Sequence, residues 1–271
     1  MKIAKALPLA DAGEEAVRAV IVSKLEADPE WHLTEYARRF GNVLNADNAA
    51  TLFAEYNESP ATYRVAVHPA AQWIRDELFR RALAEIAIPG SNRVVFTAGG
   101  NASGKSTAID LNAVRETAHV VFDSTFSNPA HARSLVDGAL NAGKAISIFY
   151  VNRPLDDALD GMMDRADIEG RVVTIEQLIR SQRGAAATVR SLWSEFGTDP
   201  RFSFIFMDNS SRRRTHEAGI ETAAPQDYTE NRRNLNELLD AAYKIGRISE
   251  FSYKRIRGRD GESGKPSSGQ A

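Results

Sequence analysis

The stretch RVVFTAGGNASGKS, residues Arg93 to Ser106, joins a short apolar run to a glycine-rich loop. From Gly99 onward the loop fits the pattern G-x-x-x-x-G-K-[ST]. In this pattern the glycines let the backbone wrap a phosphate, and successive N–H groups point inward as donors. The helix expected after the loop directs its positive N-terminal end at the same anion. A glycine-rich turn with a chance lysine is the alternative, but a strand before the loop and a helix after it favour a phosphate site.

Each position of the loop has an expected role. Lys105 can reach the β and γ phosphates of a nucleotide, and the hydroxyl of Ser106 can ligate Mg²⁺. The sequence therefore predicts a site for ATP or GTP with Mg²⁺, in which Ser106 and Asp123 are the metal ligands. The residues expected to contact the nucleotide are Gly99, Gly100, Asn101, Ala102, Ser103, Gly104, Lys105, Ser106 and Thr107.

The pattern around this loop predicts an α/β fold. Four apolar runs rich in β-branched and aromatic residues are expected to be strands: Arg93–Thr97, His119–Asp123, Ala145–Val151 and Phe202–Met207. Segments with helical spacing lie between or after them: Ser106–Val114, Ala130–Ala142, Leu155–Arg165, Ile175–Phe196 and Tyr228–Ile245. This alternation indicates a P-loop kinase-like, doubly wound and mostly parallel sheet covered by helices on both faces.

The first 90 residues look helical and precede this core. Their apolar spacing predicts helices over Ala16–Leu25, Leu33–Phe40, Ala46–Tyr56 and His68–Ile86, the last with Pro69 in its first turn. We expect three parts: an α-helical region over 1–90, a kinase domain over 91–250, and a disordered tail over 257–271. The helical region is either a packing extension, a surface that docks a partner, or a built-in inhibitor.

Composition narrows the class of protein. The chain has 271 residues, 43% of them hydrophobic, with a net charge of −2 and no cysteine. Disulfides and thiolate metal sites are therefore excluded, and the near-neutral charge gives no pull toward nucleic acid or an anionic membrane. No apolar run is long enough to span a bilayer, and the start of the chain lacks the apolar core of a signal peptide. We expect a cytoplasmic location.

The positions of acidic residues and arginines in the sequence help to distinguish a kinase from a hydrolase. Asp123 and Asp208 end apolar strands, where a parallel sheet binds its ligands. Asp123 is either a base and metal ligand or a helix-capping acid, while Asp208 suits a turn. Neither is followed by a glutamate that would activate water, which favours transfer to an acceptor hydroxyl. Arg165 and Arg171 flank an expected lid segment and could clamp the transferring phosphoryl group.

These pieces occur in a specific order. After the loop come Asp123-Ser124-Thr125, a helix ending in Ala142-Gly143-Lys144, the strand from Ala145, Arg165, Gly170-Arg171-Val172-Val173 and Asp208-Asn209-Ser210. Over roughly Val94–Ser210 this order and spacing resemble the zeta toxin family of P-loop kinases, which often has Glu-Gly-Thr where this chain has Asp-Ser-Thr.

The resemblance implies an ATP-dependent kinase whose acceptor is uridine-diphosphate N-acetylglucosamine or a related sugar nucleotide. It also implies a toxin held in check by a partner antitoxin. Carried over by position, Lys105 and Ser106 bind phosphate and metal, Thr125 contacts substrate, and Arg165 and Arg171 hold the γ phosphate. We accordingly predict Asp123, Lys105, Arg165 and Arg171 as the catalytic residues.

One feature departs from the family. Zeta toxins usually have a further strand after the loop helix, ending in the aspartate that serves as base. Here only 17 residues, 106–122, separate Lys105 from Asp123, which leaves room for a helix and one strand. Asp123 therefore either acts as the base, or replaces the glutamate that binds substrate in the family, or has neither role. Other functions remain open: a kinase of a nucleotide, dinucleotide cofactor or nucleic-acid end, or a nucleotide-dependent switch with slow ATPase activity.

Overall fold

The computed structural model describes residues 12–86, 92–108, 111–169, 173–210, 216–224 and 228–258; the side chains of 107, 108, 111, 112, 167–169, 216 and 228–230 are outside the description. Within these residues six strands form one sheet in the order β1-β3-β2-β4-β5-β6. Their bounds are β1 Val43–Leu44, β2 Arg93–Ala98, β3 Val120–Asp123, β4 Ala145–Asn152, β5 Phe202–Asp208 and β6 His216–Ala218. All neighbours pair in parallel except β5 and β6. The four predicted strands and the mostly parallel α/β fold are confirmed.

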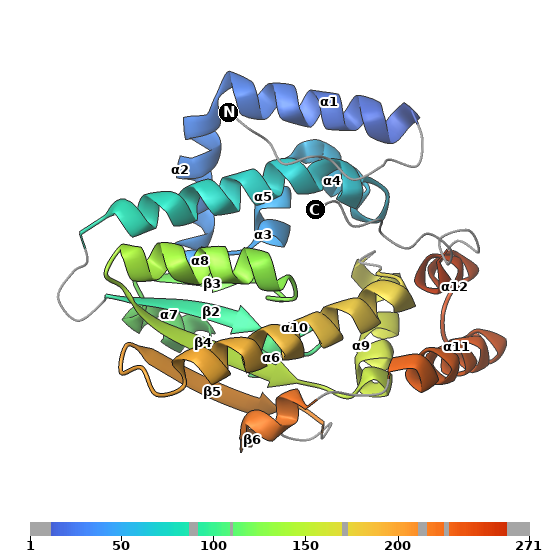
Figure 1. Cartoon of the computed structure of the whole chain (residues 1–271). Helices are drawn as coiled ribbons and strands as arrows, with labels where there is room; N and C mark the ends of the chain where they lie inside the picture. Colours follow the sequence, from blue (N-terminus) through green and yellow to red (C-terminus); the bar gives the residue numbers. More distant parts are fainter. Residues whose placement is uncertain are drawn as a thin grey trace, which may run out of the picture.

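Helices follow the strands where the apolar spacing predicts them over 130–142, 155–165, 175–196 and 228–245 (Figure 1). The single helix expected over 106–114 is instead two short helices, and the helix over 250–257 was not predicted. Their bounds are α6 Lys105–Ala108, α7 Leu111–Thr117, α8 Pro129–Asn141, α9 Leu155–Glu169, α10 Ile175–Phe196, the 3-10 turn η1 Ile220–Ala223, α11 Tyr228–Lys244 and α12 Glu250–Arg257. Alternation along β2 and β3 sends side chains to both faces of the sheet. Phe96 and Phe122 pack toward α5, α8 and α10, whereas Val95 and Val121 pack with Val114 of α7.

The helical region before the phosphate loop differs in detail from the prediction. Its helices are α1 Ala12–Ala27, α2 Pro29–Phe40, α3 Ala46–Ala50, α4 Ala54–Glu58 and α5 Pro60–Ala84. The helix expected over 46–56 is thus two short helices separated near Phe53. The expected start at His68, with Pro69 in the first turn, is wrong, because α5 begins at Pro60, which takes the favoured first-turn position, while Pro69 is buried inside the helix.

A strand missed by the sequence lies in this region. β1 comprises only Val43 and Leu44, which pair in parallel with Val121 and Phe122 of β3. Asn42 secures it by donating from its side chain to the carbonyls of Arg115 and Ala118, at 3.0 and 2.9 Å. A segment from the helical region therefore forms the edge of the kinase-like sheet.

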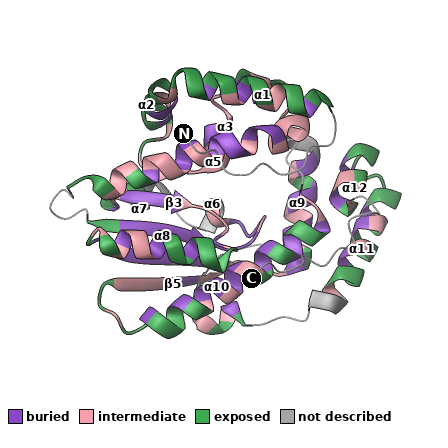
Figure 2. Cartoon of the chain, turned by 45° about the horizontal axis from the view of Figure 1, so that its top comes forward, coloured by how far each residue is buried: buried purple, intermediate pink, exposed green. Residues whose placement is uncertain are grey.

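One apolar cluster joins the helical region to the sheet. Ile21, Tyr36 and Phe53 belong to the same buried cluster as Phe96 and Phe122, and each is at most 1% exposed. Figure 2 shows buried positions both on α5 and along β3. Burial at about 25 cal/mol per Å² of apolar surface makes this shared core a principal source of stability.

A second cluster is formed by the helices near the carboxyl end of the chain. Leu159 of α9, Leu178 of α10, Leu239 of α11 and Ile256 of α12 are fully buried together. The expectation of a tail beginning at residue 257 is wrong at its first position, because Arg257 is the last residue of α12. Gly258 follows as the C-cap of α12, and the remainder of the predicted disordered tail, 259–271, lies outside the described residues.

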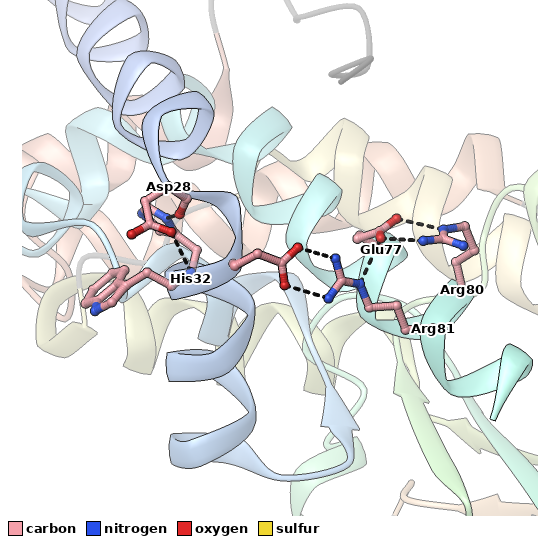
Figure 3. A network of polar contacts seen from close by, with 7 residues as sticks. Asp28, His32, Glu77, Arg80 and Arg81 are labelled. Atoms are coloured by element: carbon pink, nitrogen blue, oxygen red, sulfur yellow. Dashed lines mark hydrogen bonds and ion pairs between the residues drawn. The ribbon is translucent and has the colours of Figure 1, made fainter. Parts of the chain in front are cut away.

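Polar contacts connect α2 to α5 at the surface (Figure 3). The guanidinium of Arg81 bonds to both carboxylate oxygens of Glu30, at 2.8 and 2.5 Å, and to Glu77 at 2.9 Å. Asp28 caps α2 by accepting from the backbone N–H of Trp31. Exposed ion pairs of this kind contribute about 0.2–1 kcal/mol each, so they orient α2 more than they stabilise it.

Candidate nucleotide site

The phosphate loop turns sharply between β2 and α6. Gly99 has φ +136 and Gly104 has φ +82, and both conformations favour glycine. Space adds a second constraint, since a Cβ on Gly104 would lie 2.3 Å from Nδ2 of Asn209. Ala102 adopts φ 55, a strained conformation for a residue with a side chain, of the kind that clusters at ligand sites. The local conformation fits a backbone shaped around an anion.

Lys105 is the first residue of α6 and lies against the loop. Its ammonium donates to the carbonyls of Gly99 and Gly100, at 2.9 and 3.3 Å. Burial lowers the pKa of Lys105, while the carboxylates of Asp123 and Asp47 oppose this effect and Arg165 adds to it. The charges of two acids, and of one of the arginines expected to act as a clamp, therefore act on the ammonium of Lys105.

Several residues that support the loop were not predicted. The side chain of Asn209 donates to the carbonyl of Ser103 at 2.9 Å, and Arg153 donates to that of Ala102 at 3.1 Å. From α10, the hydroxyl of Ser181 accepts from the N–H of Asn101 at 2.9 Å. These contacts join residues that are 51 to 106 positions apart in the sequence. Sequence spacing does not predict contacts over such separations.

Asp123 ends β3 beside the loop. Its Oδ1 accepts from the hydroxyl of Thr97 at 2.5 Å, and its Oδ2 accepts from the amide of Asn45 at 2.6 Å. Thr97 is fully buried and pairs with Asp123 across β2 and β3. Asn45 comes from the helical region, directly after β1. Both carboxylate oxygens of Asp123 are therefore engaged by donors of the fold.

The remaining predictions for this edge of the sheet concern the site residues Thr125, Arg171 and Thr107 and the turn at Asp208. Thr125 lies on the loop, since its carbonyl accepts from the N–H of Gly99 at 3.1 Å and its hydroxyl bonds to that of Ser127 at 2.8 Å. Asp208 forms the expected turn, accepting from the backbone and hydroxyl of Ser210 at 3.0 and 2.8 Å. Arg171 and the side chain of Thr107 lie outside the described residues.

The donor set suits a magnesium ion that also binds phosphates. The hydroxyl of Ser106 is exposed at the start of α6, and the carboxylate of Asp123 ends the adjacent strand. Both are the oxygen ligands that Mg²⁺ prefers, and a few protein ligands suffice where phosphates complete the shell. Among the described residues, no group of three or more histidines, cysteines or acids could hold a metal by itself.

A strand, a wrapped glycine loop with its lysine and a following helix in a parallel sheet define a P-loop protein with a kinase-like fold. Residues 112–218 match the family model described as Zeta toxin. The match confirms the resemblance drawn from the sequence over a segment that includes Asp123, Thr125 and Arg165. It begins after the phosphate loop, so the loop's assignment depends on its own sequence and geometry.

Other comparisons are more distant. A search of curated proteins found no match. Among solved structures, the chain is similar to the native AvrRxo1-ORF1:AvrRxo1-ORF2 complex, with a TM-score of 0.42, and to the same complex with ATP, at 0.42, and with sulphate ions, at 0.43. Each is 12% identical, and each comparison covers 72% of this chain and 84% of the other. None of the described helices is long and apolar enough to cross a membrane.

Proposed function

We propose that this chain is an ATP-dependent kinase that transfers the γ-phosphoryl group to a hydroxyl of a sugar nucleotide such as uridine-diphosphate N-acetylglucosamine. The observation that carries the proposal is the phosphate loop with Lys105 bonded to its carbonyls and Asp123 at the end of the neighbouring strand, in a chain with a zeta toxin segment. Lysine and arginine beside a phosphate loop neutralise the charge that spreads over the transferring oxygens.

Each residue has a distinct part in this proposal. Lys105 leaves the loop carbonyls to bind the β and γ phosphates, and the loop's N–H groups hold the same oxygens. Arg165 steadies the γ phosphate, and Arg171 joins it from the segment that follows α9. Thr125 contacts the acceptor. When bound, Mg²⁺ would neutralise phosphate charge, with Ser106 and Asp123 as its protein ligands.

The decisive experiment is a transfer assay with a matched charge control. The purified protein is incubated with ATP and Mg²⁺, together with either the named sugar nucleotide or a bacterial metabolite extract, and mass spectrometry detects a gain of one phosphate. We expect Lys105→Ala to weaken ATP binding by about 10- to 150-fold, the equivalent of 1.5–3 kcal/mol for a charged hydrogen bond. Lys244→Ala, which removes an exposed lysine at the end of α11, should leave affinity and transfer unchanged.

The outcomes separate the parts of the proposal. Soluble protein that binds ATP but phosphorylates nothing in the extract contradicts the kinase. A product from the extract but not from the sugar nucleotide keeps the kinase and identifies another acceptor.

We further propose that the kinase acts as a toxin restrained by an antitoxin protein. Expression in bacteria should then arrest growth, and Lys105→Ala should relieve the arrest while Lys244→Ala does not. Normal growth with soluble, ATP-binding protein would defeat the toxin claim alone.

A further inference from the structure

The segment between β3 and α8 carries Thr125, the residue expected to contact the acceptor. Its backbone is fixed to the phosphate loop, because the carbonyl of Thr125 accepts from the N–H of Gly99 at 3.1 Å. Its side chain is fixed from another direction, since the hydroxyls of Thr125 and Ser127 are hydrogen-bonded at 2.8 Å. A hydroxyl hydrogen rotates to suit its partner, so the bond to Ser127 sets the direction in which the Thr125 hydroxyl can meet a ligand.

The backbone between these two hydroxyls has little freedom to move. Phe126 has φ 55, a left-handed conformation that is rare for a bulky side chain. Its ring is 4% exposed and stacks on Phe96 of β2, with ring centroids 5.2 Å apart. Its N–H donates to the hydroxyl of Ser124 at 3.1 Å. Such strain persists only where the surrounding structure imposes it, so the packing of Phe126 holds its two neighbours in one arrangement.

Helix α10 packs closely against this segment. A Cβ on Gly184 would overlap the carbonyl oxygen of Ser127 and would lie 3.0 Å from the Cβ of Ser127. Glycine destabilises the interior of a helix relative to alanine, and here its missing side chain permits the close approach. One turn earlier on the same helix, Ser181 accepts from the N–H of Asn101 in the phosphate loop at 2.9 Å. One helix therefore contacts both the phosphate loop and the segment that carries Thr125.

We propose that Ser127 and Gly184 are positioning residues for the acceptor: Ser127 orients the hydroxyl of Thr125, and Gly184 lets α10 hold Ser127 at the place this requires. The inference rests on the proposed kinase activity and on the expected contact between Thr125 and the acceptor. Any shift of Ser127 reaches the Thr125 hydroxyl directly through their hydrogen bond. Misplacing a reacting group by about 1 Å can lower a rate about 10²-fold, so small changes at these two residues should affect transfer strongly.

The test measures the initial rate of transfer and, by calorimetry, the affinity for ATP–Mg²⁺. The acceptor is uridine-diphosphate N-acetylglucosamine and, in parallel, serial dilutions of the bacterial metabolite extract. Ser127→Ala removes one hydrogen bond and should lower the rate at low acceptor concentration by about 2- to 12-fold. Gly184→Ala displaces the backbone of Ser127 and should lower this rate by about 10²-fold. ATP affinity should stay close to that of the parent in both, because Arg153, Ser181 and Asn209 still support the phosphate loop.

Two further variants separate positioning from packing. Gly138→Ala is the matched control, because it adds the same methyl group to α8, where a Cβ would meet only the side chain of Leu83, at an ordinary 3.5 Å. It should leave the rate and the ATP affinity unchanged. Thr125→Val removes the Thr125 hydroxyl and keeps the shape of the side chain. If Ser127 acts through that hydroxyl, Ser127→Ala should not lower the rate further in the Thr125→Val chain, whereas an independent structural effect would add.

The outcomes distinguish the inference from the proposed kinase. Near-parent transfer by Ser127→Ala or Thr125→Val would overturn the inference and leave the kinase standing, as would an equal effect of Ser127→Ala in the parent and Thr125→Val chains. Gly184→Ala protein that is insoluble, or that loses ATP affinity as strongly as transfer, would remove Gly184 from the positioning role, and the hydroxyl variants would still decide that of Ser127. A parent chain that phosphorylates nothing would refute the kinase, and the inference with it.

Discussion

At the scale of single residues, the phosphate loop depends on conformations that few residues adopt. Gly104 combines a positive φ with close contact, because Asn209 occupies the space that a Cβ would need. Gly143, after α8, also has a positive φ, of +68, but nothing lies within 4 Å of its Cβ position. The two glycines therefore separate the cost of backbone strain from the cost of crowding.

We expect Gly143→Ala to destabilise the fold by about 1–2 kcal/mol, the cost of a left-handed conformation for a residue with a Cβ. Gly104→Ala should cost more, because Asn209 must give up its bond to Ser103. It should also weaken ATP binding, which Gly143→Ala should not. Urea unfolding and calorimetry measure these quantities. Equal effects of the two variants on both would show that crowding at Gly104 plays no part.

At the scale of elements, sequence periodicity predicts long segments well and short ones poorly. The bounds of α10, Ile175–Phe196, follow from apolar spacing over six turns. β1 has two residues, which give no alternation to detect, and its pairing with β3 joins positions far apart in the chain. The site divides in the same way: the local pattern identifies Lys105 and Ser106, whereas only the fold brings Asn209 to the loop and Asn45 to Asp123.

Tyr36 of α2 holds this short strand in place. Its hydroxyl donates to the carbonyl of Val43 at 2.8 Å and accepts from the N–H of Asn45 at 2.7 Å. Tyr36→Phe leaves both backbone groups without this partner and should cost about 1–3 kcal/mol near neutral pH. Because β1 leads into Asn45, we expect phosphoryl transfer to fall as well.

The pH dependence of stability gives a second measure of this contact. Burial raises the pKa of Tyr36 to about 12, from 10.0 for the ordinary side chain. A raised pKa means that the stabilisation is present in full below pH 10 and is lost as the pH rises toward 12. Over this window the parent should lose about 3 kcal/mol that Tyr36→Phe does not lose, at 1.36 kcal/mol per pH unit. Parallel stability curves for the two proteins by denaturant unfolding would argue against a buried hydroxyl.

At the scale of the whole molecule, the helical region and the sheet share one core. Ile21, Leu25 and Tyr36 are fully buried and cluster with the aromatic side chains of β2 and β3. This arrangement favours the packing extension over a detachable inhibitor among the roles considered for residues 1–90. The location of β1 at the sheet edge adds that the extension also builds part of the site. The division into a separate region and a kinase domain stays a prediction.

Removal of residues 1–60 tests this view against removal of 259–271. The first deletion takes away β1, α3 and the apolar side chains of residues 12–60 that belong to the same buried cluster as Phe96 and Phe122, so we expect insoluble protein or loss of the cooperative thermal transition. The second removes a polar, glycine- and serine-rich segment with too little apolar content to offset the entropy of ordering, so the melting temperature should stay the same. Scanning calorimetry measures both. A soluble 61–271 fragment that melts like the parent would show that the sheet folds without its edge strand.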